Sequence, residues 1–123
     1  MKLLIVDDSG VIRNKIARGA AAKAFEVVGL ARDGEEAVKL FRESQADVVT
    51  MDLTMPRMDG ITCIRALLKI RPDTLILVVS ALADKATAIE ALKQGAHGFV
   101  LKPFTDEQIG GALLELLRGA VHG

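Results

Sequence analysis

The chain has 123 residues, of which 50% are hydrophobic and 26% charged, as in an ordinary soluble globular domain. Its 16 basic residues balance 16 acidic ones, which argues against nucleic-acid binding by this chain alone. The single cysteine, Cys63, cannot form an internal disulfide, and the apolar start before Asp7 is too short for a signal peptide or a membrane span. We therefore expect one cytoplasmic domain that does not contact a membrane.

Five short apolar runs rich in Val, Leu and Ile are typical of buried parallel strands. They are Leu3–Val6, Glu26–Ala31, Val48–Met51, Leu75–Val79 and Gly98–Leu101. The segments between them have helical apolar stripes. Strands that alternate with helices predict an α/β fold with a parallel sheet and helices on both of its faces.

Several residues mark where the helices begin and end. The segments 33–36 and 105–108 both have the pattern of a capping box, which predicts a helix start at each. Gly95 is suited to closing the fourth helix, and Pro72 follows the third.

Polar residues stand at the carboxyl ends of four predicted strands: Asp7 and Asp8, then Asp52, Ser80 and Lys102. In an open α/β sheet, ligands bind at this edge. Taken singly, each residue has a simpler interpretation as a turn residue, a helix cap or a solvated lysine. Their convergence on one edge favours a shared site.

Three carboxylates at one edge repel one another, and a divalent cation among them relieves the repulsion. Oxygen ligands with room for phosphate and water favour Mg²⁺. A carboxylate beside such a metal can attack phosphorus and form an aspartyl phosphate. Lys102 and Ser80 could then pair with phosphoryl oxygens, so the pattern predicts phosphoryl transfer.

Four segments in order resemble the receiver domain of bacterial response regulators: 4–9, 51–60, 79–81 and 95–104. The resemblance runs from end to end and implies one receiver domain over residues 1–123 with no output domain. It also implies a flavodoxin-like (βα)5 three-layer sandwich whose five-stranded parallel sheet has the order 2-1-3-4-5.

The resemblance implies a role for each site residue. Asp52 is expected to be the phosphoacceptor. Mg²⁺ is expected to bind Asp7, Asp8, Asp52 and the backbone carbonyl of Thr54.

Three further residues complete the site that the resemblance implies. Ser80 is expected to be the switch hydroxyl, Phe99 the switch aromatic and Lys102 the lysine that pairs with the phosphoryl group. Plain core packing is the competing interpretation of Phe99. The resemblance also implies a cis peptide bond between Lys102 and Pro103.

The implied function is a two-component signalling switch rather than an enzyme, limited to accepting a phosphoryl group and losing it again. A histidine kinase or a small donor such as acetyl phosphate supplies the group, and the face formed by the fourth helix, fifth strand and fifth helix changes to bind a partner. The motifs are most similar to the chemotaxis branch, whose partner is the flagellar motor switch. A phosphorelay intermediate or a receiver module of a longer regulator would have the same pattern.

Rival functions fit the residues less well. A haloacid-dehalogenase-type phosphatase would need an acid at position 54, where this chain has Thr54. A flavodoxin-type flavin site would need a phosphate-binding loop where this chain has Asp7 and Asp8. A receiver that is never phosphorylated would lack an acid or the lysine.

Two helices contain unusual small residues, at 19–22 and at Gly110 and Gly111. Each helical glycine costs about 1 kcal/mol relative to alanine, so the last helix could fray. Alternatively, small residues admit close helix contact in a dimer. We expect a monomer or a weak dimer.

Overall fold

The computed structural model describes residues 1–55 and 58–122, so that Pro56 and Arg57 of the 51–60 motif, and Gly123, lie outside it. Strands and helices alternate along the described chain. The strands are β1 Lys2–Val6, β2 Glu26–Ala31, β3 Val48–Asp52, β4 Leu75–Ala81 and β5 Gly98–Lys102. The α-helices are α1 Gly10–Ala21, α2 Gly34–Ser44, α3 Gly60–Ile70, α4 Lys85–Lys93 and α5 Asp106–His122, with a 3₁₀ turn, η1 Leu82–Asp84, before α4.

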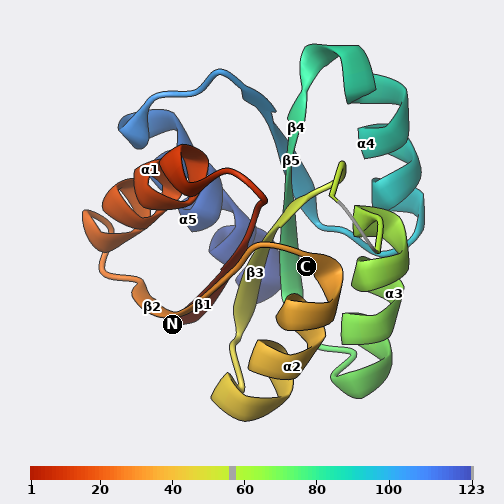
Figure 1. Cartoon of the computed structure of the whole chain (residues 1–123). Coiled ribbons are helices and arrows are strands. Elements are labelled where there is room, and N and C mark those ends of the chain that lie inside the picture. The colour runs from red at the N-terminus through yellow and green to blue at the C-terminus, as the bar shows by residue number, and fades with distance from the viewer. Residues whose placement is uncertain (56–57, 123) are drawn as a thin grey trace.

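The strands form one parallel sheet in the order β2-β1-β3-β4-β5, which confirms the predicted flavodoxin-like topology. Figure 1 shows α1 and α5 on one face of this sheet and α2, α3 and α4 on the other. None of the helices in the described ranges combines the length and the apolar character that a membrane crossing requires.

Two hydrophobic clusters hold these layers together. The α1–α5 cluster lies between the sheet and those helices and contains Leu3, Ile5, Ile16, Ala20, Phe25, Val48, Leu75, Leu77, Val79, Phe104, Ile109, Leu113 and Leu116. The α2–α4 cluster lies on the other face and contains Leu4, Val6, Ala31, Ala37, Phe41, Ala46, Val49, Met51, Leu53, Cys63, Ile64, Leu67, Ile76, Val78, Ala88, Ala91 and Ala96. Successive strand residues join opposite clusters because a strand has a side-chain period of two.

Three strands, β3, β4 and β5, extend further at their carboxyl ends than their apolar runs predict, and β1 begins one residue earlier, at Lys2. The ladder continues through the pairs Asp52 with Val79 and Ala81 with Lys102. Backbone hydrogen bonds do not depend on side-chain polarity, so a polar residue can end a strand that hydrophobicity defines only up to the preceding residue. Asp52 and Lys102 are therefore held by the sheet itself.

The predicted helix ends are largely confirmed. The Thr105 amide donates to Gln108 Oε1 at 2.8 Å and the Gln108 amide donates to Thr105 Oγ1 at 3.0 Å, a complete capping box. At the start of α2 the box is offset by one residue, because Glu36 accepts from the Arg32 amide and not from that of Asp33. Gly95 follows α4 with φ 118°, a left-handed conformation that favours glycine.

Two of the unusual glycines lie where α1 meets α5. A Cβ on Gly19 would lie 2.6 Å from the Asp106 carbonyl oxygen and would also overlap Ile109 Cγ2. A Cβ on Gly110 would lie 2.9 Å from the Gly19 carbonyl oxygen, whereas one on Gly111 would meet nothing within 4 Å. The close helix contact that small residues admit is therefore present within the chain, between α1 and α5.

Replacing Gly19 and Gly111 by alanine should shift stability in opposite directions. Gly19→Ala should lower the free energy of unfolding by about 1–3 kcal/mol, because its methyl group would overlap the α5 backbone. Gly111→Ala should raise it by about 0.5–1 kcal/mol, because it gains helix propensity in open space. Urea denaturation followed by circular dichroism measures both changes. An unaltered or more stable Gly19→Ala protein would contradict the close contact.

Candidate functional site

Side-chain alternation places three charged residues on the same face of the sheet, at its carboxyl edge. In β1, Ile5 belongs to the α1–α5 cluster, and Asp7 stands two residues further on. In β3, Val48 belongs to the same cluster, and Asp52 stands four residues further on, at the end of the strand. In β5, Val100 packs against this cluster, and Lys102 stands two residues further on. Asp7, Asp52 and Lys102 therefore meet on the side covered by α1 and α5.

Lys102 bridges two of the carboxylates. Its Nζ lies 3.0 Å from Asp7 Oδ2 and 3.7 Å from Asp52 Oδ1. Both acids are nearly inaccessible, with relative exposures of 0% for Asp7 and 5% for Asp52. Buried charges persist only when paired, so the lysine neutralises part of the acidic cluster. The peptide bond between Lys102 and Pro103 is cis, as the resemblance implies.

Asp7 is held at almost every polar atom. Its amide donates to the Ala31 carbonyl at 2.9 Å, and its Oδ1 accepts from the Ser9 amide at 2.9 Å. Its carbonyl accepts from Arg13 Nη1 at 2.8 Å. Its Oδ2 is buried and, among the described residues, has the ion pair with Lys102 but no hydrogen bond. One carboxylate oxygen is thus left with acceptor capacity for a metal ion.

The third acid, Asp8, is exposed at the surface of the site. One oxygen each from Asp7, Asp8 and Asp52 lie within 4.8 Å of one another. Opposite ligands of Mg²⁺ are about 4.2 Å apart, since each Mg–O distance is about 2.1 Å. Only one pair of the three can be opposite ligands, and adjacent ligands are about 3.0 Å apart, so the oxygens would move closer together by side-chain rotation to share the ion. The donor set therefore fits Mg²⁺.

The position of Asp52 raises its pKa to about 6. Burial is the largest cause and the negative charge of Asp7 adds to it, while Lys102 and the Thr54 amide act in the opposite direction. The Thr54 amide donates to Asp52 Oδ1 at 3.3 Å. No described contact involves the Thr54 carbonyl, so its role as a metal ligand stays a prediction.

Ser80 and Phe99 lie on the opposite face of the sheet from Asp7 and Asp52. Val78 and Phe99 are paired across β4 and β5 and contact the α2–α4 cluster, and Ser80 is two residues beyond Val78. The Ser80 hydroxyl is buried and donates to the Ala81 carbonyl at 3.3 Å. Ser80 thus lies at the carboxyl end of β4 near Asp52 but makes no hydrogen bond to it. The switch roles of Ser80 and Phe99 stay predictions.

Arg13 is a residue at this site that the sequence reasoning missed. It stands one turn into α1 and reaches back to the Asp7 carbonyl. In the sequence, Arg13 stands five residues after Asp8. A single basic residue on a helix does not predict a role in the site, because basic residues are common on helix surfaces.

Comparisons with known proteins agree with this geometry. Residues 3–114 match the family model described as response regulator receiver domain. The chain is 42% identical over 112 residues to the chemotaxis protein CheY of Thermotoga maritima, covering 91% of this chain and 93% of that protein.

Two solved structures are similar over nearly the whole chain. The response regulator domain of Thermotoga maritima CheB has a TM-score of 0.84 and 35% identity, covering 100% of this chain and 97% of that one. A chain of the CheX–CheY–BeF₃–Mg²⁺ complex from Borrelia burgdorferi has a TM-score of 0.85 and 30% identity, covering 98% and 89%.

The raised pKa of Asp52 predicts how stability depends on pH without metal. The pKa of Asp52 is about 6 in the folded chain and about 3.9 in an unfolded one. Between about pH 3.9 and pH 6, folding is therefore accompanied by proton uptake at Asp52. The contribution of Asp52 to the free energy of unfolding consequently falls as the pH rises through this range. Asp52→Asn should therefore raise the free energy of unfolding by on the order of 2 kcal/mol at about pH 7.5, and by much less at about pH 4.5. Urea denaturation in EDTA measures this difference. An equal gain in the free energy of unfolding at both pH values would mean that ionisation of Asp52 does not destabilise the folded chain.

Proposed function

The chain belongs to the response regulator receiver domain family, whose members are phosphorylatable switches of two-component systems, and we propose that Asp52 is its phosphoacceptor. The observation that carries this proposal is the bridge from Lys102 to Asp7 and Asp52. It supports a site in which one acid is the nucleophile, the second is a metal ligand and the lysine offsets added charge.

In the proposed reaction an Asp52 oxygen attacks the phosphorus atom of the donor in line with the leaving group. A P–O bond to Asp52 forms as the donor's bond to phosphorus breaks, releasing histidine from a kinase or acetate from acetyl phosphate. Asp7, Asp8 and Asp52 would hold Mg²⁺, which supplies charge neutralisation at the phosphoryl oxygens when bound. Lys102 is within reach to pair with one of these oxygens, and release of the group to water returns the carboxylate.

Phosphorylation is proposed to act through Ser80 and Phe99. The Ser80 hydroxyl has only a 3.3 Å bond to its neighbouring carbonyl, so a phosphoryl oxygen is a stronger acceptor for it. Helix α4, which would respond, has few stabilising contacts. Its N-cap has no side-chain hydrogen bond, and its described buried residues are the small Ala88 and Ala91. Small changes at Ser80 would shift the population of conformations of α4, β5 and α5.

The proposed partners are a histidine kinase and a protein target that binds the altered α4–β5–α5 face. Similarity to CheY proteins supports a role in chemotaxis, with the flagellar motor switch as one target to test. We further propose that residues 1–123 act as one receiver domain in the cytoplasm, as a monomer or weak dimer. A module of a longer regulator or a phosphorelay intermediate is the alternative.

Incubation with acetyl phosphate and Mg²⁺ should add one phosphoryl group to the protein and none to Asp52→Asn, because the amide is not a nucleophile. Intact-mass measurement detects the addition. The matched control is Asp59→Asn, since Asp59 is an exposed N-cap outside the acidic cluster and asparagine also caps helices well.

Asp59→Asn should accept the group like the unaltered protein. Phosphorylation of Asp52→Asn at the normal rate would show that another residue is the acceptor.

Ser80→Ala should still accept a phosphoryl group but respond to it weakly, because it lacks the hydroxyl. Amide NMR shifts of residues 85–102 on adding beryllofluoride and Mg²⁺ measure the response. Ser44→Ala is the control, since its hydroxyl is buried in α2 without a hydrogen bond among the described residues. If both variants respond as fully as the unaltered protein, Ser80 is not the switch hydroxyl.

A further inference from the structure

Arg13 makes a contact that the phosphoacceptor chemistry does not explain. It lies in the first turn of α1, where its own amide donates to the Ser9 carbonyl at 3.0 Å. Its side chain turns back towards the sheet, and Nη1 donates to the Asp7 carbonyl at 2.8 Å in a partly buried position. Hydrogen bonds from a charged donor are the stronger ones, about twice a neutral bond. The contact therefore restrains the peptide that joins Asp7 to Asp8.

That peptide is what places the Asp8 carboxylate. Asp8 is exposed, and within the described part of the chain its side chain has no hydrogen bond or ion pair of its own. The position of its oxygen therefore depends on the backbone on either side. On one side Arg13 holds the Asp7 carbonyl, and on the other the Ser9 amide is held by Asp7 Oδ1.

Resting on the proposed function, we infer that Arg13 is a positioning residue that orients Asp8 for the divalent cation. It acts through the Asp7 carbonyl and not by touching the metal or the phosphoryl group. Residues that orient metal ligands in this way are worth about 10- to 100-fold in metal affinity. Loss of Arg13 should therefore weaken Mg²⁺ binding while the fold and the nucleophile remain in place.

A purely electrostatic role for Arg13 has the opposite sign. Three carboxylates attract a cation, and a guanidinium beside them opposes it, so removing the positive charge would by itself tighten Mg²⁺ binding. The direction of the change in affinity therefore separates positioning from charge compensation.

The test is isothermal titration of the metal-free protein with MgCl₂ alone. Arg13→Met should raise the Mg²⁺ dissociation constant about tenfold, because methionine removes the donor. Arg13→Lys keeps the charge with a shorter reach and should give a smaller increase. The control is Arg18→Met, which removes one charge from the same helix at the exposed pair with Asp106 and should change the constant by less than about twofold.

Rates of acetyl phosphate reaction give a second measurement. The Mg²⁺ concentration for half-maximal rate should rise in Arg13→Met, while the rate at saturating Mg²⁺ should match the unaltered protein. Unchanged or tighter Mg²⁺ binding in Arg13→Met, or equal weakening in Arg18→Met, would overturn the inference. Because titration needs no phosphoryl donor, it remains decisive if Asp52 proves not to be the acceptor. If Arg13→Met does not fold, normal binding by Arg13→Lys together with its normal half-maximal Mg²⁺ concentration overturns the inference.

Discussion

Repulsion among three carboxylates at one sheet edge is the constraint on which the rest of this structure depends. Asp7 and Asp52 are almost completely buried, and Asp8 stands beside them. Lys102 relieves part of the repulsion, yet the pKa of Asp52 stays near 6 because burial and Asp7 outweigh the lysine. A cluster with surplus negative charge favours binding of a divalent cation.

The sheet lies between the buried acids with Lys102 and the proposed switch residues. Asp7, Asp52 and Lys102 lie on the face covered by α1 and α5, whereas Ser80 and Phe99 lie on the face covered by α2, α3 and α4. Asp52 pairs with Val79, so Ser80 is one residue away along β4 and on the opposite side. The proposed signal from Asp52 to α4 would therefore pass through the carboxyl end of a single strand, β4.

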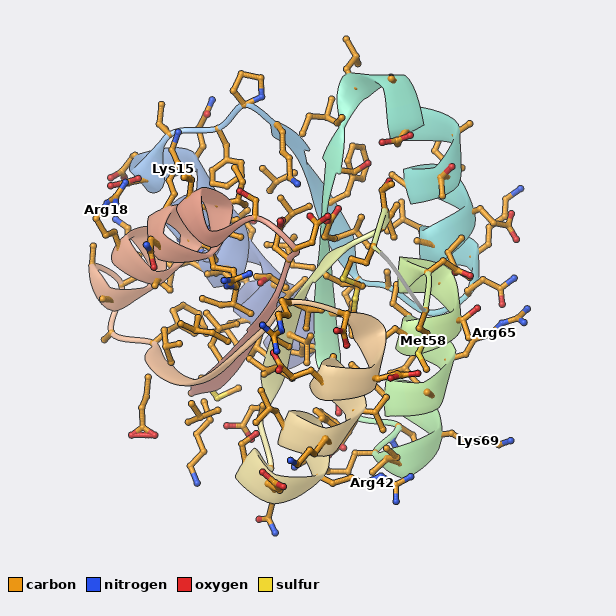
Figure 2. All side chains as sticks on the ribbon, in the orientation of Figure 1. Lys15, Arg18, Arg42, Met58, Arg65 and Lys69 are labelled. Atoms are coloured by element: carbon orange, nitrogen blue, oxygen red, sulfur yellow. The ribbon has the colours of Figure 1, made fainter. Side chains whose placement is uncertain are left out.

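Helix α1 contacts two segments next to the site, one at Asp7 and one that follows Lys102. At its start Arg13 holds the Asp7 carbonyl. Further along, the Lys15 ammonium lies 5.2 Å from the centroid of the Phe104 ring, and Arg18 pairs with Asp106 at 3.3 Å (Figure 2). The Lys15 contact reaches the segment that follows Lys102, whereas the exposed Arg18 pair and the close approach at Gly19 lie further along, between α1 and α5. The small residues that look unusual in sequence thus allow α1 and α5 to pack closely.

The sequence by itself determined the element order, the parallel sheet and the polar residues at the strand ends, because hydrophobic period and strand direction are local properties. It also pointed to Asp7, Asp8, Asp52 and Lys102 as one site. Only the tertiary structure decided the pairing of Lys102 with Asp7, the contact of Arg13 with the Asp7 carbonyl and the use of Gly19 and Gly110 within the chain. Each depends on which side chains from distant segments come within a few ångströms, and that is set by packing between layers rather than by any local pattern.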